Sequence, residues 1–243
     1  MTEPVKDHLV MIVGESATGK SASLRNLPNH SRVAYLNCES GKKLPFRNKF
    51  ATIVVTDPYQ VFDAFDEIEA NPGSFDYIVI DTLTFLMEMY ESIYVLNSAN
   101  TMQAWSNYAQ FFKELMQSKV ANCKIPVIIL AHTRRDLNES TMEYDVAVPV
   151  KGALKNNGLE AYFSTIVACK KVSTKELEKY KSDLLTITEE DEMLGYKHVF
   201  QTRLTKATKN DRIRSPMDMF TVQQTYIDPD AALLMQHLVE YYD

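Results

Sequence analysis

Glycine and cysteine are both scarce in this sequence, with seven glycines and three cysteines among 243 residues. The cysteines Cys38, Cys123 and Cys169 lie far apart and show none of the paired spacings found in zinc sites and redox motifs. We therefore expect three reduced thiols, which is the usual state of cysteine in a cytoplasm.

Long apolar runs and an excess of positive charge are also missing. No apolar run approaches the roughly 18 residues that a membrane helix needs, and the first residues carry acidic side chains before an apolar run begins at Leu9. We therefore expect no membrane contact, no export signal and a cytoplasmic location. The 26 Lys and Arg against 32 Asp and Glu give a net charge of -6, so any nucleic-acid site must be local.

What the sequence does have is a regular alternation of short apolar runs with helical patterns, which predicts an α/β fold with a mostly parallel central sheet flanked by helices. The length and the 45% hydrophobic content suit a single domain over residues 1–243. Two late runs predict additional C-terminal strands, at His198–Thr205 and Thr225–Ile227. The buried strands are expected at Leu9–Val13, Val33–Leu36, Ile53–Val55, Tyr77–Ile80, Val127–Leu130 and Tyr162–Ala168.

Two polar segments interrupt this pattern. Thr133–Asn157 has no sustained period, and a segment of that length is typical of a functional or mobile loop. Lys170–Glu192 is rich in charge and is expected to be an insertion with a short solvated helix. A helical stripe elsewhere is interpreted as core packing rather than as a ligand platform; it consists of Trp105, Tyr108, Phe112, Leu115 and Met116.

One motif carries a defined chemistry: Gly14-Glu15-Ser16-Ala17-Thr18-Gly19-Lys20-Ser21 is a complete Walker A loop. In such a loop the backbone N–H groups cradle phosphates, the lysine reaches the outer phosphates and the hydroxyl ligates Mg²⁺. The motif follows the apolar run Leu9–Val13 and precedes a predicted helix, Lys20–Asn26, whose N-terminus favours an anion. The alternative is a glycine turn with an exposed lysine.

Three further side chains follow predicted strands, at the edge where parallel sheets collect their chemistry. Asp81 ends the run Tyr77–Ile80 and is predicted to be a Walker B ligand of Mg²⁺, with a helix N-cap as the alternative. Glu39 could activate a water molecule, and His132 could bind or sense the γ-phosphate. The alternatives for these two are a solvated loop glutamate and a core histidine.

The order of four segments resembles the RecA-like recombination ATPases, in particular the reduced versions in phages that act in single-strand annealing or recombination. These segments are Tyr35–Glu39, Val127–His132, Asn157–Phe163 and Arg203–Pro216. The resemblance covers about Leu9 to Pro216 and implies ATP as the nucleotide. It implies that Glu39 activates water and that His132 stands where the family has a sensor, usually glutamine.

The resemblance also implies the partners. It makes Thr133–Asn157 a loop that binds single-stranded DNA, although its charges sum to zero; the candidate contacts are Arg134, Arg135, Tyr144, Lys151 and Lys155. Lys209 and Arg212 would reach the ATP of a neighbouring subunit in a ring or filament, with a basic exposed hairpin as the alternative. A single-stranded-DNA-binding protein is a possible further partner, and the location would be the host cytoplasm if a phage encodes the chain.

The sequence therefore favours an ATP-hydrolysing oligomeric recombination protein that acts on single-stranded DNA. The first rival is a P-loop switch or assembly ATPase whose partner is a protein. A small-molecule kinase is disfavoured because the sequence has no arginine-rich lid, and a GTPase because it has no Asn-Lys-x-Asp motif.

Overall fold

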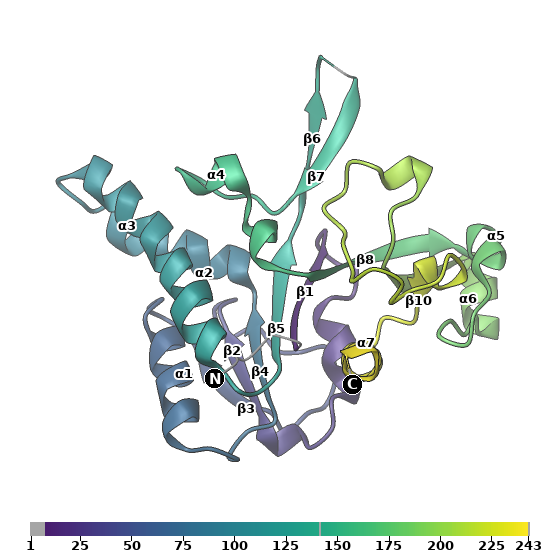
Figure 1. Cartoon of the computed structure of the whole chain (residues 1–243), viewed down its shortest axis with the longest axis horizontal. Coiled ribbons are helices and arrows are strands. Elements are labelled where there is room, and N and C mark those ends of the chain that lie inside the picture. Colours follow the sequence, from purple (N-terminus) through teal and green to yellow (C-terminus); the bar gives the residue numbers. More distant parts are fainter. Residues whose placement is uncertain (1–7, 141, 243) are drawn as a thin grey trace.

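Eight strands form one sheet in the computed structural model, which describes residues 8–140 and 142–242 (Figure 1). In chain order they are β1 Leu9–Gly14, β2 Val33–Asn37, β3 Ala51–Val54, β4 Tyr77–Asp81, β5 Val127–His132, β8 Thr165–Ser173, β9 Tyr196–Gln201 and β10 Tyr226–Ile227. Across the sheet the order is β10-β9-β8-β1-β5-β4-β2-β3. The first seven residues, with the acidic side chains noted above, lie outside the described residues.

Strands β3, β2, β4, β5, β1 and β8 run parallel, whereas β9 and β10 pair antiparallel at one edge. This confirms the predicted α/β fold with a mostly parallel sheet and C-terminal antiparallel strands. The P-loop strand β1 is separated from the Walker B strand β4 by β5. The register places Gly14 opposite His132 and Asp81 opposite Leu130, so the carboxyl ends of the three strands meet at one edge.

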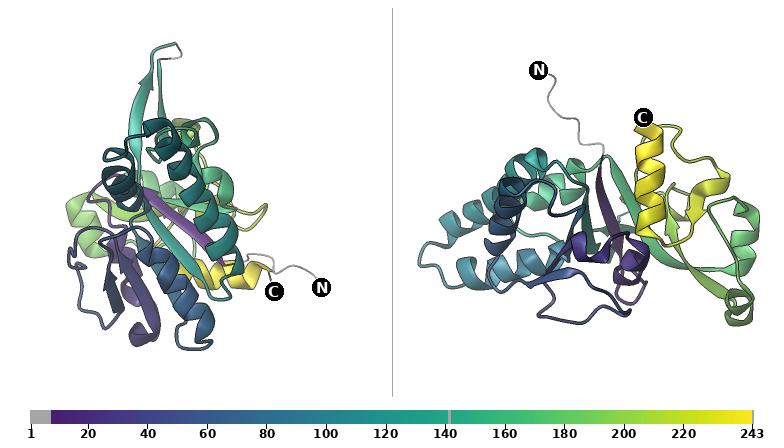
Figure 2. Two further views of the ribbon diagram at one scale, coloured as in Figure 1. Left: turned by 90° about the vertical axis from the view of Figure 1, so that its left-hand side faces the viewer. Right: turned by 90° about the horizontal axis from the view of Figure 1, so that it is seen from below.

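Helices cover both faces of the sheet because alternate strand residues face opposite sides. Leu9, Met11 and Val13 of β1 pack toward α1, α2 and α3, whereas Val10 and Ile12 pack toward α7 and the turn after the P-loop. Figures 1 and 2 show this arrangement around β1. The helix bounds are α1 Gln60–Ala70, α2 Leu83–Tyr90, α3 Thr101–Glu114 and α7 Ala231–Tyr242. Trp105 in α3 is partly buried against the core, as the helical stripe predicts.

The segment Thr133–Asn157 is not an irregular loop. It holds an antiparallel hairpin of β6 Arg134–Asn138 and β7 Glu143–Ala147, followed by the short helix α4 Leu154–Asn157. Figures 1 and 2 show the hairpin projecting from the carboxyl edge of the sheet. Its strands lie away from the core. Tyr144 and Val146 alternate with Glu143 and Asp145 in β7, but Leu137 is the one apolar residue of β6, so the sequence does not identify a pair of half-buried strands.

Other boundaries also differ from the sequence-based expectation. Strand β8 continues through Lys170 to Ser173, so the charged segment begins inside the sheet and then forms α5 Thr174–Leu177 and α6 Glu189–Leu194. The predicted helix after the P-loop is a 3-10 turn, Ser21–Asn26, and Asn157–Phe163 contains only the 3-10 turn Leu159–Tyr162. Charge and glycine patterns mark solvent exposure, but they do not fix where a strand ends.

The basic segment Arg203–Pro216 is neither a hairpin nor an edge strand. Within it lie the 3-10 turn Lys206–Thr208 and isolated bridges from Asp211 to Val146 and from Arg214 to Ile166. The three cysteines are free thiols, as expected. None of the helices in residues 8–140 and 142–242 combines the length and apolar character needed to cross a membrane.

Candidate functional site

The Walker A loop leaves the end of β1 with backbone angles that glycine favours. Gly19 has a φ of +102°, and Ala17 has a φ of +61°. A Cβ on Gly14 would lie 2.6 Å from the carbonyl oxygen of Cys169 and 2.7 Å from Thr18 Oγ1. Because real Cβ atoms do not approach other atoms so closely, Gly14 is required by the close passage of β8.

The Lys20 side chain lies inside the loop. Its ammonium donates hydrogen bonds to the carbonyl oxygens of Gly14 at 3.0 Å and Glu15 at 2.9 Å, and its Nζ lies 3.3 Å from His132 Nδ1. Burial lowers the pKa of Lys20, because removal from water disfavours the charged form. An anion bound in the loop would restore a favourable environment for this charge.

Asp81, at the end of β4, has one satisfied carboxylate oxygen and one orphan. Ser21 Oγ donates to Oδ2 at 2.8 Å, and the Tyr35 hydroxyl donates to the same atom at 2.7 Å. Asp81 Oδ1 is buried and has no hydrogen-bond partner among the described residues. Burial raises the pKa of this carboxyl, against the opposing effect of its two donors.

This arrangement fits a magnesium ion that binds together with a nucleotide. Mg²⁺ is usually held by one or two protein oxygens plus phosphates and water, rather than by a cage of side chains. Ser21 Oγ and the orphan Asp81 Oδ1 supply such oxygens. In the described part of the chain, no three His, Cys, Asp or Glu side chains converge as a separate metal site.

Glu39, which follows β2, is held at both carboxylate oxygens. His132 Nε2 lies 3.3 Å from Oε1, and the Lys42 ammonium donates to Oε2 at 2.7 Å. The hydrogen bond from His132, with a smaller contribution from Lys42, lowers the pKa of Glu39 to about 2. A carboxylate with so low a pKa is a weak base in this arrangement.

These side chains surround one cavity of about 410 Å³ at the carboxyl edge of the sheet. It is lined by Ser16, Ala17, Gly19, Lys20, Ser21, Ala22, Tyr35, Glu39, Lys42, Lys43, Leu44, Pro45, Asp81, His132 and His198. The sequence singled out six of the polar members, and the structure brings them together from four separate segments. The sequence did not indicate Tyr35, Lys42 and His198, because their spacing matches no motif. Proximity to Glu39 in the chain was the only available signal for Tyr35 and Lys42.

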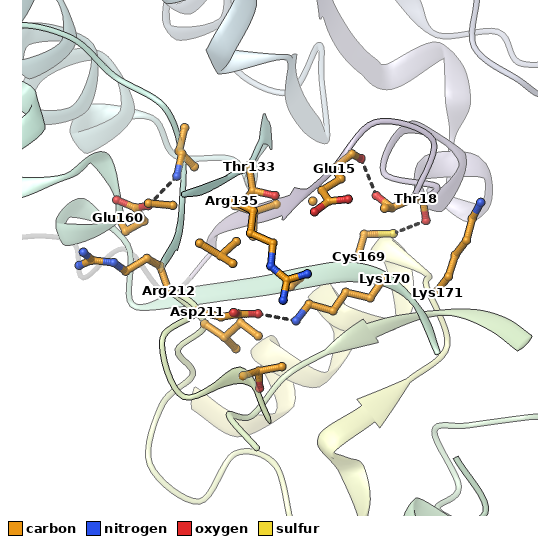
Figure 3. A pocket seen from close by; sticks show the side chains of 18 of the residues that line it. Glu15, Thr18, Thr133, Arg135, Glu160, Cys169, Lys170, Lys171, Asp211 and Arg212 are labelled. Carbon is orange, nitrogen blue, oxygen red and sulfur yellow. Dashed lines mark hydrogen bonds and ion pairs between the residues drawn. The ribbon is translucent and has the colours of Figure 1, made fainter. Parts of the chain in front are cut away.

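The late basic residues lie elsewhere. Lys209 forms an ion pair with Glu143 next to the turn of the hairpin, with 2.5 Å between Nζ and Oε1, and its side chain is exposed. Arg212 lines a second cavity of about 450 Å³, whose other walls include the P-loop, Arg135 and Lys171 (Figure 3). Neither Lys209 nor Arg212 is among the described residues that line the 410 Å³ cavity of their own chain.

The five candidate DNA contacts do not form one cluster. Arg134 and Arg135 point to opposite faces of the hairpin, because neighbouring strand residues alternate. Arg134 donates a hydrogen bond to Asp136 within β6, and Lys151 forms an ion pair with Glu91, outside the hairpin. Lys155 and Arg134 both line a third cavity. Tyr144 packs against the Arg135 guanidinium, with 4.3 Å from the guanidinium carbon to the ring centroid.

Comparison with known proteins shows the family of this chain. Residues 6–209 match the family described as AAA domain. No curated protein sequence matches the chain. Among solved structures, one ATPase domain is similar at a TM-score of 0.43 and 13% identity, over 74% of each chain. Because the family match spans well over half of the sequence and includes the Walker A loop, this chain belongs to the AAA domain family of P-loop ATPases.

Proposed function

We propose that this protein binds Mg-ATP and hydrolyses it, and that its affinity for single-stranded DNA depends on the bound nucleotide. The backbone of the P-loop and Lys20 would hold the phosphates. Ser21 and Asp81 would hold Mg²⁺, which neutralises charge on the phosphates when bound. Glu39 would activate the attacking water once its carboxylate is released from His132 and Lys42.

One chain of contacts supports this proposal most strongly. Lys20 Nζ meets His132 Nδ1, and His132 Nε2 meets Glu39 Oε1, so one imidazole links the phosphate-binding lysine to the candidate base. A γ-phosphate would compete for the Lys20 ammonium and the imidazole and would thereby release Glu39 from His132. The Lys42 ammonium at Oε2 would have to be displaced separately. His132 is also the last residue of β5, and the hairpin begins two residues later at Arg134.

The hairpin itself has two chemically different faces. Residues directly opposite in the register share a face, so Arg135, Leu137, Tyr144 and Val146 lie together on one side. Leu137 and Tyr144 are 47% and 49% exposed there. The other face carries the acidic side chains Asp136, Glu143 and Asp145 with Arg134.

The first face suits single-stranded nucleic acid. Aromatic rings stack on unpaired bases, and cations bind the backbone phosphates. This face opens toward the 450 Å³ cavity, where Arg135, Lys171 and Arg212 have no carboxylate partner among the described residues (Figure 3). The acidic face would repel the same backbone. The rival function, a protein partner on the exposed Leu137 and Tyr144, makes no use of these cations.

We also propose that subunits assemble in a ring or filament and that Lys209 and Arg212 reach the ATP of a neighbour. Their absence from the nucleotide cavity of their own chain, within the described residues, supports a role in trans. A cation supplied across an interface stabilises transition-state charge, so turnover per subunit would rise with protein concentration. DNA annealing or strand pairing in a phage is the proposed setting, and it rests on the resemblance of the sequence.

Two substitutions separate nucleotide binding from chemistry. Lys20→Ala removes the phosphate-binding ammonium and should abolish measurable Mg-ATP binding, whereas Glu39→Gln should bind Mg-ATP and lose at least roughly 100-fold in turnover. Glu67→Gln, on the exposed surface of α1, is the matched control. The measurements are equilibrium Mg-ATP binding and the ATPase rate with and without single-stranded DNA. Normal turnover in a folded Glu39→Gln protein would remove Glu39 from the mechanism.

The two adjacent arginines test the face of the hairpin that holds DNA. Arg135→Ala and Arg134→Ala change the net charge equally, but only Arg135 lies on the aromatic face. Arg135→Ala should weaken binding of a fluorescent oligothymidine and reduce the slope of log affinity against log salt by about 0.7, the value for one lost phosphate contact. Arg134→Ala should leave the slope unchanged. If the unsubstituted protein binds no oligothymidine, the protein-partner function replaces the DNA function.

A further inference from the structure

Two side chains from the C-terminal strands converge on one carbonyl of the P-loop. The Sγ atom of Cys169, in β8, lies 3.0 Å from the carbonyl oxygen of Thr18 (Figure 3). His198 Nδ1, in β9, lies 2.6 Å from the same oxygen. A carbonyl oxygen only accepts hydrogen bonds, so both the thiol and the imidazole Nδ1 donate to it.

Both donors are in the form that this contact requires. Burial raises the pKa of the Cys169 thiol to about 12, so the S–H group is retained at neutral pH. The Nδ1–H of His198 is present in the cation and in one neutral tautomer, and the contact with Thr18 selects that tautomer. Within residues 8–140 and 142–242, His198 Nε2 has no hydrogen-bond partner, so the ring is held by its Nδ1 hydrogen bond.

The Thr18 carbonyl controls the direction of the next amide. In a trans peptide the C=O and the following N–H point in opposite directions. With the Thr18 oxygen directed toward β8 and β9, the N–H of Gly19 points away from them. The contact is close: a Cβ on Gly19 would lie 3.3 Å from His198 Nδ1 and 3.7 Å from Cys169 Sγ.

We propose that His198 and Cys169 are positioning residues of the nucleotide site, which hold the Thr18–Gly19 peptide so that its N–H faces the phosphates of a bound nucleoside triphosphate. This inference rests on the proposed nucleotide binding. It gives two residues of β8 and β9, which lie outside the Walker motifs, a role in the affinity for nucleotide. Without the two donors the peptide is free to rotate, and a bound phosphate loses part of the preorganised cradle.

Four variants of His198 and His237 test the assignment atom by atom. The side-chain amide nitrogen of asparagine can occupy the place of Nδ1, whereas that of glutamine corresponds to Nε2. His198→Asn should therefore keep near-normal affinity, and His198→Gln and His198→Ala should weaken binding roughly 2- to 10-fold, the range for one net hydrogen bond. His237 lies on α7 and is hydrogen-bonded to the Met219 carbonyl, so His237→Ala is the control for histidine removal. Cys169→Ala combined with His198→Ala should lose more than either alone.

Affinities are measured for both Mg-ATP and Mg-tripolyphosphate, because the second ligand has no nucleoside. A positioning role weakens binding of both ligands by the same factor. A loss confined to Mg-ATP would overturn the proposal and make His198 a nucleoside contact. Equal affinities in the Asn, Gln and Ala variants would also overturn it. Failure of the unsubstituted protein to bind either ligand would instead reject the proposed nucleotide binding, so the two failures are distinct. Should His198→Ala not fold, the comparison of Asn with Gln decides.

Discussion

The contact of 3.3 Å between Lys20 Nζ and His132 Nδ1 is the interaction on which the rest of this site depends. It places a buried ammonium against an imidazole whose other nitrogen meets Glu39. The pKa values of both Lys20 and Glu39 are shifted in this arrangement. Burial lowers the pKa of Lys20, and the hydrogen bond from His132 lowers the pKa of Glu39. A phosphate anion entering the loop alters both conditions at once. In the proposed mechanism, Glu39 is therefore restrained until a phosphate displaces these contacts.

The order of the strands makes this contact possible. Because β5 lies between β1 and β4, His132 emerges beside Gly14 and on the same edge as Asp81. The backbone N–H of His132 donates to the buried Thr84 Oγ1 at 2.9 Å, which anchors the backbone to α2. The ring can therefore change partners while the strand end stays in place. The hairpin begins two residues later, at Arg134, so the proposed link between the ring and the hairpin is two residues long.

The sequence predicted the parallel sheet because strands buried on both faces are continuous apolar runs, as in β1 and β5. It also predicted Lys20, Ser21 and Asp81, since Walker chemistry needs those residue types at fixed positions relative to strands. It did not predict the hairpin, because the apolar alternation is confined to Tyr144 and Val146 in β7, and β6 has only Leu137 as an apolar residue. The positions of Tyr35, Cys169 and His198 at the site were not predicted for another reason. They reach the site by tertiary contact alone, and no local pattern encodes which carbonyl or carboxylate they meet.

If His132 transmits the nucleotide state from the P-loop to the β6–β7 hairpin, a bound nucleotide must change the hydrogen exchange of the hairpin. The measurement is amide hydrogen exchange of residues 134–140 and 142–147, with and without a non-hydrolysable Mg-ATP analogue. The analogue should change protection in the hairpin of the unsubstituted protein and of a His30→Ala control, but not in His132→Ala at saturating analogue. An equal change of protection in His132→Ala would contradict this role of His132.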